Sequence, residues 1–325
     1  MDQVKVSKLK CDFSKLNQEM FFSLVDYRNN YFSSSDPEKI IEFYEGFENR
    51  DQLIKWMKER PKGISKIFEV EGNKEIIVVI PTADYEGKYA KQCRDNIFKG
   101  LHIIFVESGR DYYFNYAHNC NIGVKKAMTY NPKWVVVSND DMYKIDDVKK
   151  LRESLTKLHD GCDIVFTNEG IYHSRDVLIS TRTIRRNLVV CLIGRLERSR
   201  LRMEKKFKIE LIIGTTLNYR RYLYKPIKRV RYTGAFGIFS RKFVQNCNYK
   251  LYNETYINGT EDIDLSLRIY SGRFKVEVID YSIGDLIGQT IGPYNKTRRI
   301  RGLVNDCYFN HKVFATFNNF VINEN

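Results

Sequence analysis

The sequence predicts an α/β fold in which a mostly parallel sheet is covered by helices. Four short apolar runs lack the polar–apolar alternation of a half-exposed strand, so we expect strands that are buried on both faces. These runs cover residues 76–80, 101–106, 134–137 and 164–166. Helical stretches lie between them, at about 86–98, 117–129 and 146–159. Strands and helices that alternate in this way are typical of a parallel sheet.

The N-terminal part of the chain is expected to be helical and carries no chemical motif. Asp36 and Pro37 suit the N-cap and the first position of a helix, which Gly46 could end. A second helix is expected over 50–60, before Pro61. Packing is the expected role of both helices.

The α/β pattern is interrupted after the fourth strand and resumes near residue 232. A strand is expected over 232–240, a helix from near Thr260 to Gly272, and a strand over 274–279. The expected organisation is an N-terminal helical extension, a central α/β domain with a basic helical insertion, and a C-terminal tail. The expected bounds are 1–70, 71–290 with the insertion at 171–231, and 291–325.

Composition indicates an ordinary globular protein. The 325-residue chain is 43% hydrophobic and 29% charged. It begins MDQVKVSKLK, without the apolar stretch of a signal peptide, and no apolar run approaches the roughly 20 residues of a membrane-spanning helix. Its seven cysteines include no C-x-x-C pair, which favours reduced thiols over a disulfide framework or a zinc site. The expected location is the cytoplasm.

Polar residues follow each of the first three predicted strands. They are Pro81-Thr82-Ala83-Asp84, Glu107-Ser108-Gly109-Arg110-Asp111 and Ser138-Asn139-Asp140-Asp141. Right-handed crossovers bring the carboxyl ends of such strands to one edge of the sheet, where ligands of open α/β sheets bind. We therefore expect these carboxylates to line one crevice.

The turn at Asn139-Asp140-Asp141 has the composition of a site for Mg²⁺ or Mn²⁺. These cations are usually held by one or two carboxylates, with phosphate oxygens in other positions. Asp141 is the expected direct ligand. The structural alternative is a turn followed by a helix cap, which Asn and Asp also favour.

Two further motifs are expected to open helices. Asp262, next to Glu261, could act as a general base that removes the proton of a hydroxyl group, although acids also suit a helix start electrostatically. Asn121 and Gly123 lie in the stretch 119–123, whose exposed N–H groups could bind a diphosphate or a sugar hydroxyl. A plain helix cap is the alternative for this stretch.

Six segments in order resemble the GT-A glycosyltransferases, and most closely the inverting family 2. They are IIVVIPT, IIFVESGRD, AHNCNIGVKKA, WVVVSNDDM, YTGAFGIFSRKF and GTEDIDLSLRI. The resemblance covers about residues 75–280, without the basic insertion. It implies a Rossmann-like GT-A fold and transfer of a sugar, with inversion, from a nucleotide-diphosphate sugar to a hydroxyl of a glycan or lipid-linked acceptor. It also implies Mn²⁺ or Mg²⁺ as cofactor.

The resemblance assigns roles to individual residues. Asp262 would be the base, with Glu261 beside it, and Asp141 would bind the metal. Many relatives carry a His soon after the last strand, where this chain has none and Asp285 could serve as an oxygen ligand instead. The nucleotide sugar would contact Pro81, Thr82, Asp84, Glu107 (where relatives usually have Asp), Asn121, Gly123, Asn139 (in place of Asp), Asp140, Gly234 and Ala235.

The insertion 171–231 holds 17 Lys or Arg and 4 Asp or Glu, against 37 and 36 in the rest of the chain. Ile184, Leu188, Leu192 and Leu196 recur every four residues, as on one face of a helix. Three roles remain open: an interfacial helix on an anionic membrane surface, a phosphate clamp over the donor, or a solvated helical pair.

Two other functions are weighed against a glycosyltransferase. A sugar-phosphate nucleotidyltransferase would carry a Gly-rich phosphate loop after the first strand, where Pro81-Thr82-Ala83-Asp84 stands instead. A protein that binds nucleic acid or an anionic surface would interleave aromatic and basic residues, which only 219–228 does. Nucleic acid is therefore not an expected partner, and the oligomeric state is not predicted.

Overall fold

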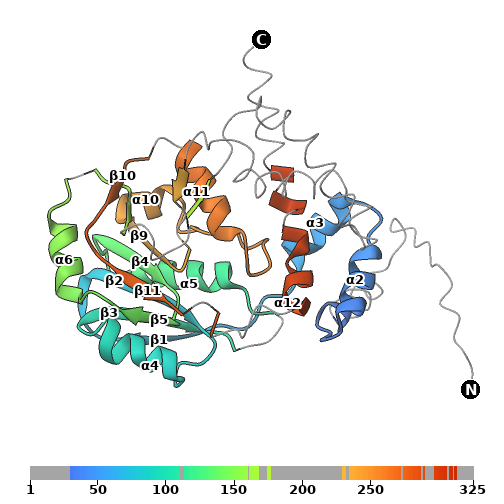
Figure 1. Ribbon diagram of the computed structural model, residues 1–325, viewed down its shortest axis with the longest axis horizontal. Coiled ribbons are helices and arrows are strands. Elements are labelled where there is room, and N and C mark those ends of the chain that lie inside the picture. Colours follow the sequence, from blue (N-terminus) through green and yellow to red (C-terminus); the bar gives the residue numbers. More distant parts are fainter. Residues whose placement is uncertain are drawn as a thin grey trace, which may run out of the picture.

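The computed structural model describes the central sheet, most of its helices and parts of both terminal regions. The described residues are 30–109, 113–159, 161–167, 174–176, 229–231, 234–271, 274–286, 288–289, 296–305, 307–309 and 311–312. Figure 1 shows the sheet with helices on its faces and a separate group of helices, α2, α3 and α12, at one end of the molecule.

A mixed sheet of seven strands forms the centre of the protein. In spatial order the strands are β1 (Lys66–Val70), β3 (Leu101–Glu107), β2 (Asn73–Thr82), β4 (Trp134–Ser138), β9 (Phe236–Ser240), β6 (Ile164–Phe166) and β10 (Val276–Val278). β1 and β9 run antiparallel to their neighbours, and the other five strands share one direction. An α/β fold is therefore confirmed. The carboxyl ends of β2, β3 and β4 lie at the same edge as the amino end of β9.

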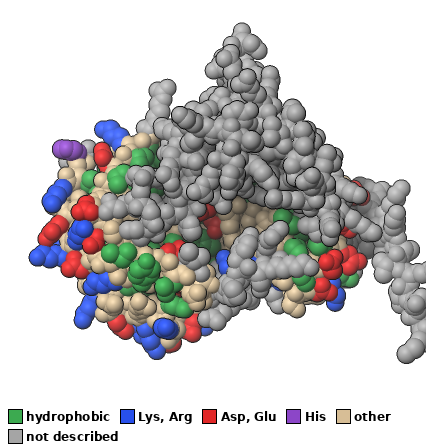
Figure 2. Space-filling view, viewed as in Figure 1, with side chains coloured by type: hydrophobic (Ala, Val, Ile, Leu, Met, Phe, Trp, Pro, Cys, Tyr) green, Lys and Arg blue, Asp and Glu red, His purple; other side chains and the backbone are tan. Residues whose placement is uncertain are grey.

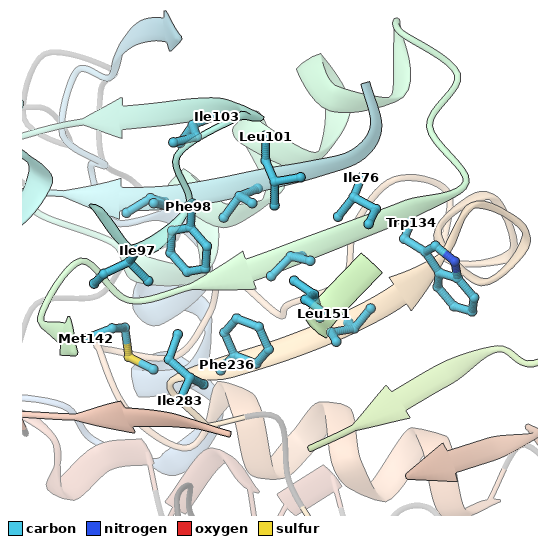
Figure 3. Packing of buried hydrophobic residues seen from close by; sticks show 14 of the residues in the cluster. Ile76, Ile97, Phe98, Leu101, Ile103, Trp134, Met142, Leu151, Phe236 and Ile283 are labelled. Carbon is cyan, nitrogen blue, oxygen red and sulfur yellow. The ribbon is translucent and has the colours of Figure 1, made fainter. Parts of the chain in front are cut away.

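The apolar strands have a hydrophobic core on each face of the sheet. Alternate residues of β2 point to opposite faces, so that Ile76, Val78 and Ile80 belong to one core and Ile77 and Val79 to the other. The first core also contains side chains from α4 (Lys88–Gln92), the π-helix η2 (Cys93–Ile97) and α6 (Val148–Thr156). Figure 3 shows Ile97 of η2 and Leu151 of α6 in this core, together with Phe236 of β9. The second is covered by α5 (Tyr116–Met128), α10 (Arg241–Asn246) and α11 (Glu261–Ser271).

The two terminal regions pack together in a third apolar group, which we call the terminal cluster. It joins buried residues of α2 (Pro37–Glu45) and α3 (Arg50–Glu59) to Tyr256, Ile257 and residues in and after α12 (Lys296–Arg301). The start of α2 is as predicted: Asp36 accepts a hydrogen bond from the Glu38 N–H at 2.9 Å, and Pro37 occupies the first helical position. The expected extension 1–70 is not helical throughout, because β1 belongs to the central sheet.

Two short two-stranded sheets complete the described structure. β5 (Met142–Lys144) pairs with β11 (Ile283–Asp285), and β7 (Ser174–Asp176) pairs with β8 (Arg229–Arg231), at the two ends of the basic insertion. The expected helix around 184–196 lies outside the described residues. Figure 2 shows Lys and Arg interspersed with Asp and Glu on the described surface of one face. No helix within the described residues has the length and apolar character needed to cross a membrane.

Candidate functional site

The ends of β2 and β4 are joined by a direct hydrogen bond between two predicted site residues. Thr82 donates from Oγ1 to Oδ2 of Asp140 at 2.6 Å, and both side chains are almost fully buried. Thr82 is the last residue of β2, and Asp140 follows β4 by two positions. The bond fixes the acidic turn against the neighbouring strand, since a short O–H···O⁻ bond is among the stronger side-chain interactions.

The remaining predicted residues after β2 and β3 lie at the same edge. Asp84 donates its N–H to the hydroxyl of Thr82 at 3.2 Å, and its own side chain is exposed. Glu107, the last residue of β3, accepts the N–H of Tyr85 at 2.8 Å. Pro81, the residue before Thr82 in β2, pairs with Val106 of β3. The two strand ends thus support each other through the loop at 83–86.

The start of β9 completes this edge. Asn139 donates its N–H to the carbonyl oxygen of Ala235 at 2.8 Å, and Ala235 is buried. Gly234 is half-buried beside it. Because β9 is antiparallel to β4, its first residues meet the last residues of β4, so the two predicted segments are in direct contact.

Asp141 and Asp285 form a pair of neighbouring carboxylates. The pairing of β5 with β11 sets Asp285 opposite Met142, and the Leu286 N–H donates to the carbonyl oxygen of Asp141 at 2.9 Å. The Gln289 N–H donates to Oδ2 of Asp141 at 2.8 Å. Burial raises the pKa of Asp141, backbone hydrogen bonds lower it, and the charge of Asp285 raises it further. A cation between the two groups would relieve this repulsion.

The donor set fits a hard divalent cation. Among the described residues, no group of three His, Cys, Asp or Glu side chains is arranged to hold a metal ion. Asp141, which directly precedes β5, and Asp285, the last residue of β11, each offer carboxylate oxygens. Mg²⁺ in nucleotide sites is typically held by one or two carboxylates plus substrate phosphates. The pair therefore suits a cation that arrives with a phosphorylated ligand.

The acidic pair at the start of α11 combines a buried and a half-buried carboxyl group. Glu261 is buried, and its Oε2 accepts the Gly259 N–H at 2.6 Å. Burial raises the pKa of Glu261 to about 7, with the charge of Asp262 acting in the same direction. Asp262 is half-buried and accepts the Ile263 N–H at Oδ1. Asp262 is thus the more accessible of the two for a ligand.

The backbone before this pair is strained. Thr260 has a φ of 77°, in the left-handed region that a β-branched residue rarely adopts. The Thr260 carbonyl oxygen accepts the Asp264 N–H at 2.9 Å, so α11 starts next to Thr260, as expected, but from an unusual backbone conformation. Such a conformation costs about 1–3 kcal/mol and is common at functional sites.

Contacts with α5 bring the acidic pair to the carboxyl edge of the sheet. Asn258 accepts the Tyr116 N–H at 2.9 Å and donates from Nδ2 to the carbonyl oxygen of Phe114 at 2.9 Å. Phe114 and Tyr116 lie where the chain that leaves β3 enters α5. The loop before α11 is therefore held at the edge where β2, β3 and β4 end.

Asn121 and Gly123 do not lie at a helix start. α5 begins at Tyr116, and Asn115 is its N-cap, accepting the His118 N–H at 2.9 Å. The expectation that 119–123 opens the helix is therefore wrong, because Asn115 supplies the cap one turn earlier and the amides of 119–123 lie within the helix. Asn121 is buried and exchanges two hydrogen bonds with the backbone of Tyr252, at 2.8 and 3.0 Å.

Gly123 has a packing role in this structure. A Cβ atom at this position would lie 2.3 Å from Cγ1 of Val79, so only glycine allows α5 to approach β2 this closely. The direct contacts of Gly123 and Asn121 are thus with the protein itself.

The segment after β11 was not expected to reach the site. The amide of Gln289 contacts Asp141, and its side-chain oxygen lies 3.4 Å from the hydroxyl of Tyr89. No motif in the sequence marks this segment, because a backbone amide can donate whatever the side chain.

Comparisons with models of protein families and with curated proteins find no match for this chain.

Proposed function

We propose that this protein is an inverting GT-A glycosyltransferase that moves a sugar from a nucleotide-diphosphate sugar to an acceptor hydroxyl. The observation that carries the proposal is the meeting of the Asp141–Asp285 pair with the polar ends of β2, β3, β4 and β9 at one edge. That edge is where open α/β sheets bind ligands. The half-buried Asp262 at the same edge supports a role in proton transfer.

Asp141 and Asp285 would hold Mn²⁺ or Mg²⁺ together with the diphosphate of the donor. When bound, such a cation supplies Lewis-acid stabilisation of the negative charge on the leaving group. The Thr82–Asp140 hydrogen bond would keep the acidic turn in place while the donor enters and leaves.

Asp262 would act as the general base. Its carboxylate takes the proton of the acceptor hydroxyl as the acceptor oxygen forms a bond to the anomeric carbon. The bond from that carbon to the diphosphate breaks at the same time, and its electron pair leaves with the nucleoside diphosphate. Attack from the side opposite the leaving group inverts the configuration.

A thermal-shift screen of nucleotide sugars, with and without Mn²⁺ or Mg²⁺, tests this proposal. One donor should raise the melting temperature only when the metal is present. Asp141→Asn should abolish that shift, and it should still fold because burial already disfavours the charge of Asp141. Asp262→Asn should keep the shift but slow transfer by about 100-fold or more.

Glu75→Gln is the matched control, because Glu75 is exposed near the amino end of β2, at the edge of the sheet opposite the site, and the substitution makes the same carboxylate-to-amide change there. It should behave as the parent protein in both assays. The proposal is wrong if no nucleotide sugar gives a metal-dependent shift. It is also wrong if Asp262→Asn transfers sugar at the parental rate.

A further inference from the structure

A pocket with a mainly basic lining, which we call the α11 pocket, lies between α3, α11 and the loop that connects α10 to α11. Its volume is about 380 Å³, within the roughly 300–1,000 Å³ of small-molecule sites. Five cationic side chains line it: Lys58, Lys62, Lys250, Arg268 and Lys312. The lining also includes two acids, Glu254 and Asp264. No described residue of the candidate functional site belongs to this lining.

Both acids of the α11 pocket already have cationic partners within its lining. Lys62 forms an ion pair with the Glu254 carboxylate, which also lies 3.0 Å from Nδ1 of His118. Lys312 forms an ion pair with Asp264, which is almost fully buried. Because these pairs neutralise the two acids, the five cations leave an excess of three positive charges in the lining.

Two of the remaining cations, Lys58 and Lys250, form no ion pair with a described residue. Lys58 lies in the last turn of α3, and Lys250 precedes the buried Leu251. Each ammonium group carries three N–H donors. Arg268, one turn after Asp264 on α11, donates to the carbonyl oxygen of Leu251, which is a neutral acceptor. A concave surface with such an excess of one charge concentrates ions of the opposite charge, so the α11 pocket attracts anions.

A second basic pocket, which we call the α6 pocket, differs in the exposure of its cations. Its volume is about 630 Å³, and its four cations are all exposed: Lys99, Lys149, Arg152 and Lys157. Exposed charges are screened by water and salt and attract an anion weakly. In the α11 pocket, by contrast, Lys62, Arg268 and Lys312 are only partly exposed, so their charges are screened less.

We propose that the α11 pocket is a second ligand site, for a small molecule that carries a phosphate monoester. Such a group has a charge of about −1.5 to −2 at pH 7 and three acceptor oxygens. It matches an excess of three positive charges better than a carboxylate, which has one negative charge and two oxygens. Lys58 and Lys250 donate to the phosphate oxygens, and the rest of the pocket holds the group that carries the phosphate. The site does not depend on the transferase function, because it shares no described residue with the candidate functional site.

Isothermal titration calorimetry of the full chain tests this site, with inorganic phosphate and glycerol 3-phosphate as probes. The titrations are made at pH 7.5 and constant ionic strength, with EDTA to remove divalent cations. Both probes should bind the parent protein, and glycerol should not. Lys58→Gln combined with Lys250→Gln should weaken binding by about 10-fold or more, because each substitution removes a charged hydrogen bond. Both lysines are exposed, so this double variant should fold.

The matched control combines Lys149→Gln with Lys157→Gln, which removes two positive charges from the α6 pocket. It should bind both probes as the parent does, and so should Asp141→Asn, which alters the candidate functional site. Lowering the pH from 7.5 to 5.5 should weaken binding, because the phosphate group takes up a proton with a pKa of about 6.

Three results would overturn the proposal. The first is the absence of binding of either probe to the parent. The second is an equal affinity of the parent and the Lys58 and Lys250 double variant. The third is a loss of binding in the α6 control or in Asp141→Asn that is as large as in that double variant, because the phosphate would then bind elsewhere or respond only to net charge.

Discussion

Glu261→Gln should become more stable than the parent protein as the pH rises, because the parent loses unfolding free energy that the variant keeps. The pKa of Glu261 is raised from 4.5 to about 7 in the folded protein, mainly by burial. A carboxyl group with a raised folded pKa gives stability that is fully present below the unfolded pKa. This stability is lost as the pH rises through the folded pKa. Gln does not titrate, so the variant avoids this loss and can still accept the Gly259 N–H.

The size of the effect follows from the pKa shift. A displacement from 4.5 to about 7, at about 1.4 kcal/mol per pH unit, corresponds to about 3 kcal/mol at pH 8. Urea unfolding of both proteins between pH 4.5 and 8 measures it. The difference in unfolding free energy should grow by this amount in favour of Glu261→Gln. Titrating groups that do not interact with Glu261 contribute equally to both proteins and cancel.

Glu254→Gln is the control. Burial raises the pKa of Glu254, but hydrogen bonds from His118, Asn121 and Lys62 outweigh it and lower the pKa below the usual range. The stability that Glu254 gives is therefore present above its unfolded pKa and is lost only at more acid pH. This variant should be less stable than the parent at every pH between 5 and 8, because it loses the ion pair with Lys62 throughout this range. If the difference in unfolding free energy between Glu261→Gln and the parent stayed constant from pH 4.5 to 8, the reasoning about the acidic pair would be refuted.

Two further substitutions test how the site is held together. Thr82→Val removes the 2.6 Å donor to Asp140 and should cost about 2 kcal/mol in urea unfolding, while Thr82→Ser keeps most of the stability. Equal stability of the Val and Ser variants would show that the bond does not fix the turn. Gly123→Ala should destabilise the protein, because the clash with Val79 costs about 1–3 kcal/mol and exceeds the ~1 kcal/mol that Ala gains over Gly in a helix. A rise in the urea midpoint would contradict the close packing of α5.

The strands that the sequence predicts best are those whose composition leaves no alternative. β2, β3, β4 and β6 are β-branched runs buried on both faces, and the structure contains all four. β1 escapes prediction because it has five residues and only Phe68 and Val70 turn inward. The direction of β9 could not be predicted, since local composition is the same for a parallel and an antiparallel strand.

The candidate site likewise contains residues that the local sequence predicts and residues that only the fold reveals. Asp141 and Asp262 stand out because acids follow a strand end and begin a helix. The prediction that Asn121 lies at a helix start was wrong. Asn115 and Asn119 are both suitable N-cap residues, and only the fold decides between them.

Paramagnetic Mn²⁺ offers the most direct test that acids from separate segments share one site. With a nucleoside diphosphate and ¹³C-labelled Asp and Glu carboxyl groups, Mn²⁺ should broaden the signals of Asp141 and Asp285 most strongly. It should also broaden those of Asp262 and Glu261, and leave that of Glu75, at the opposite edge of the sheet, sharp. Broadening centred on other acids would contradict the account, and so would an Asp262 signal that stays as sharp as that of Glu75 while the Asp141 signal is lost.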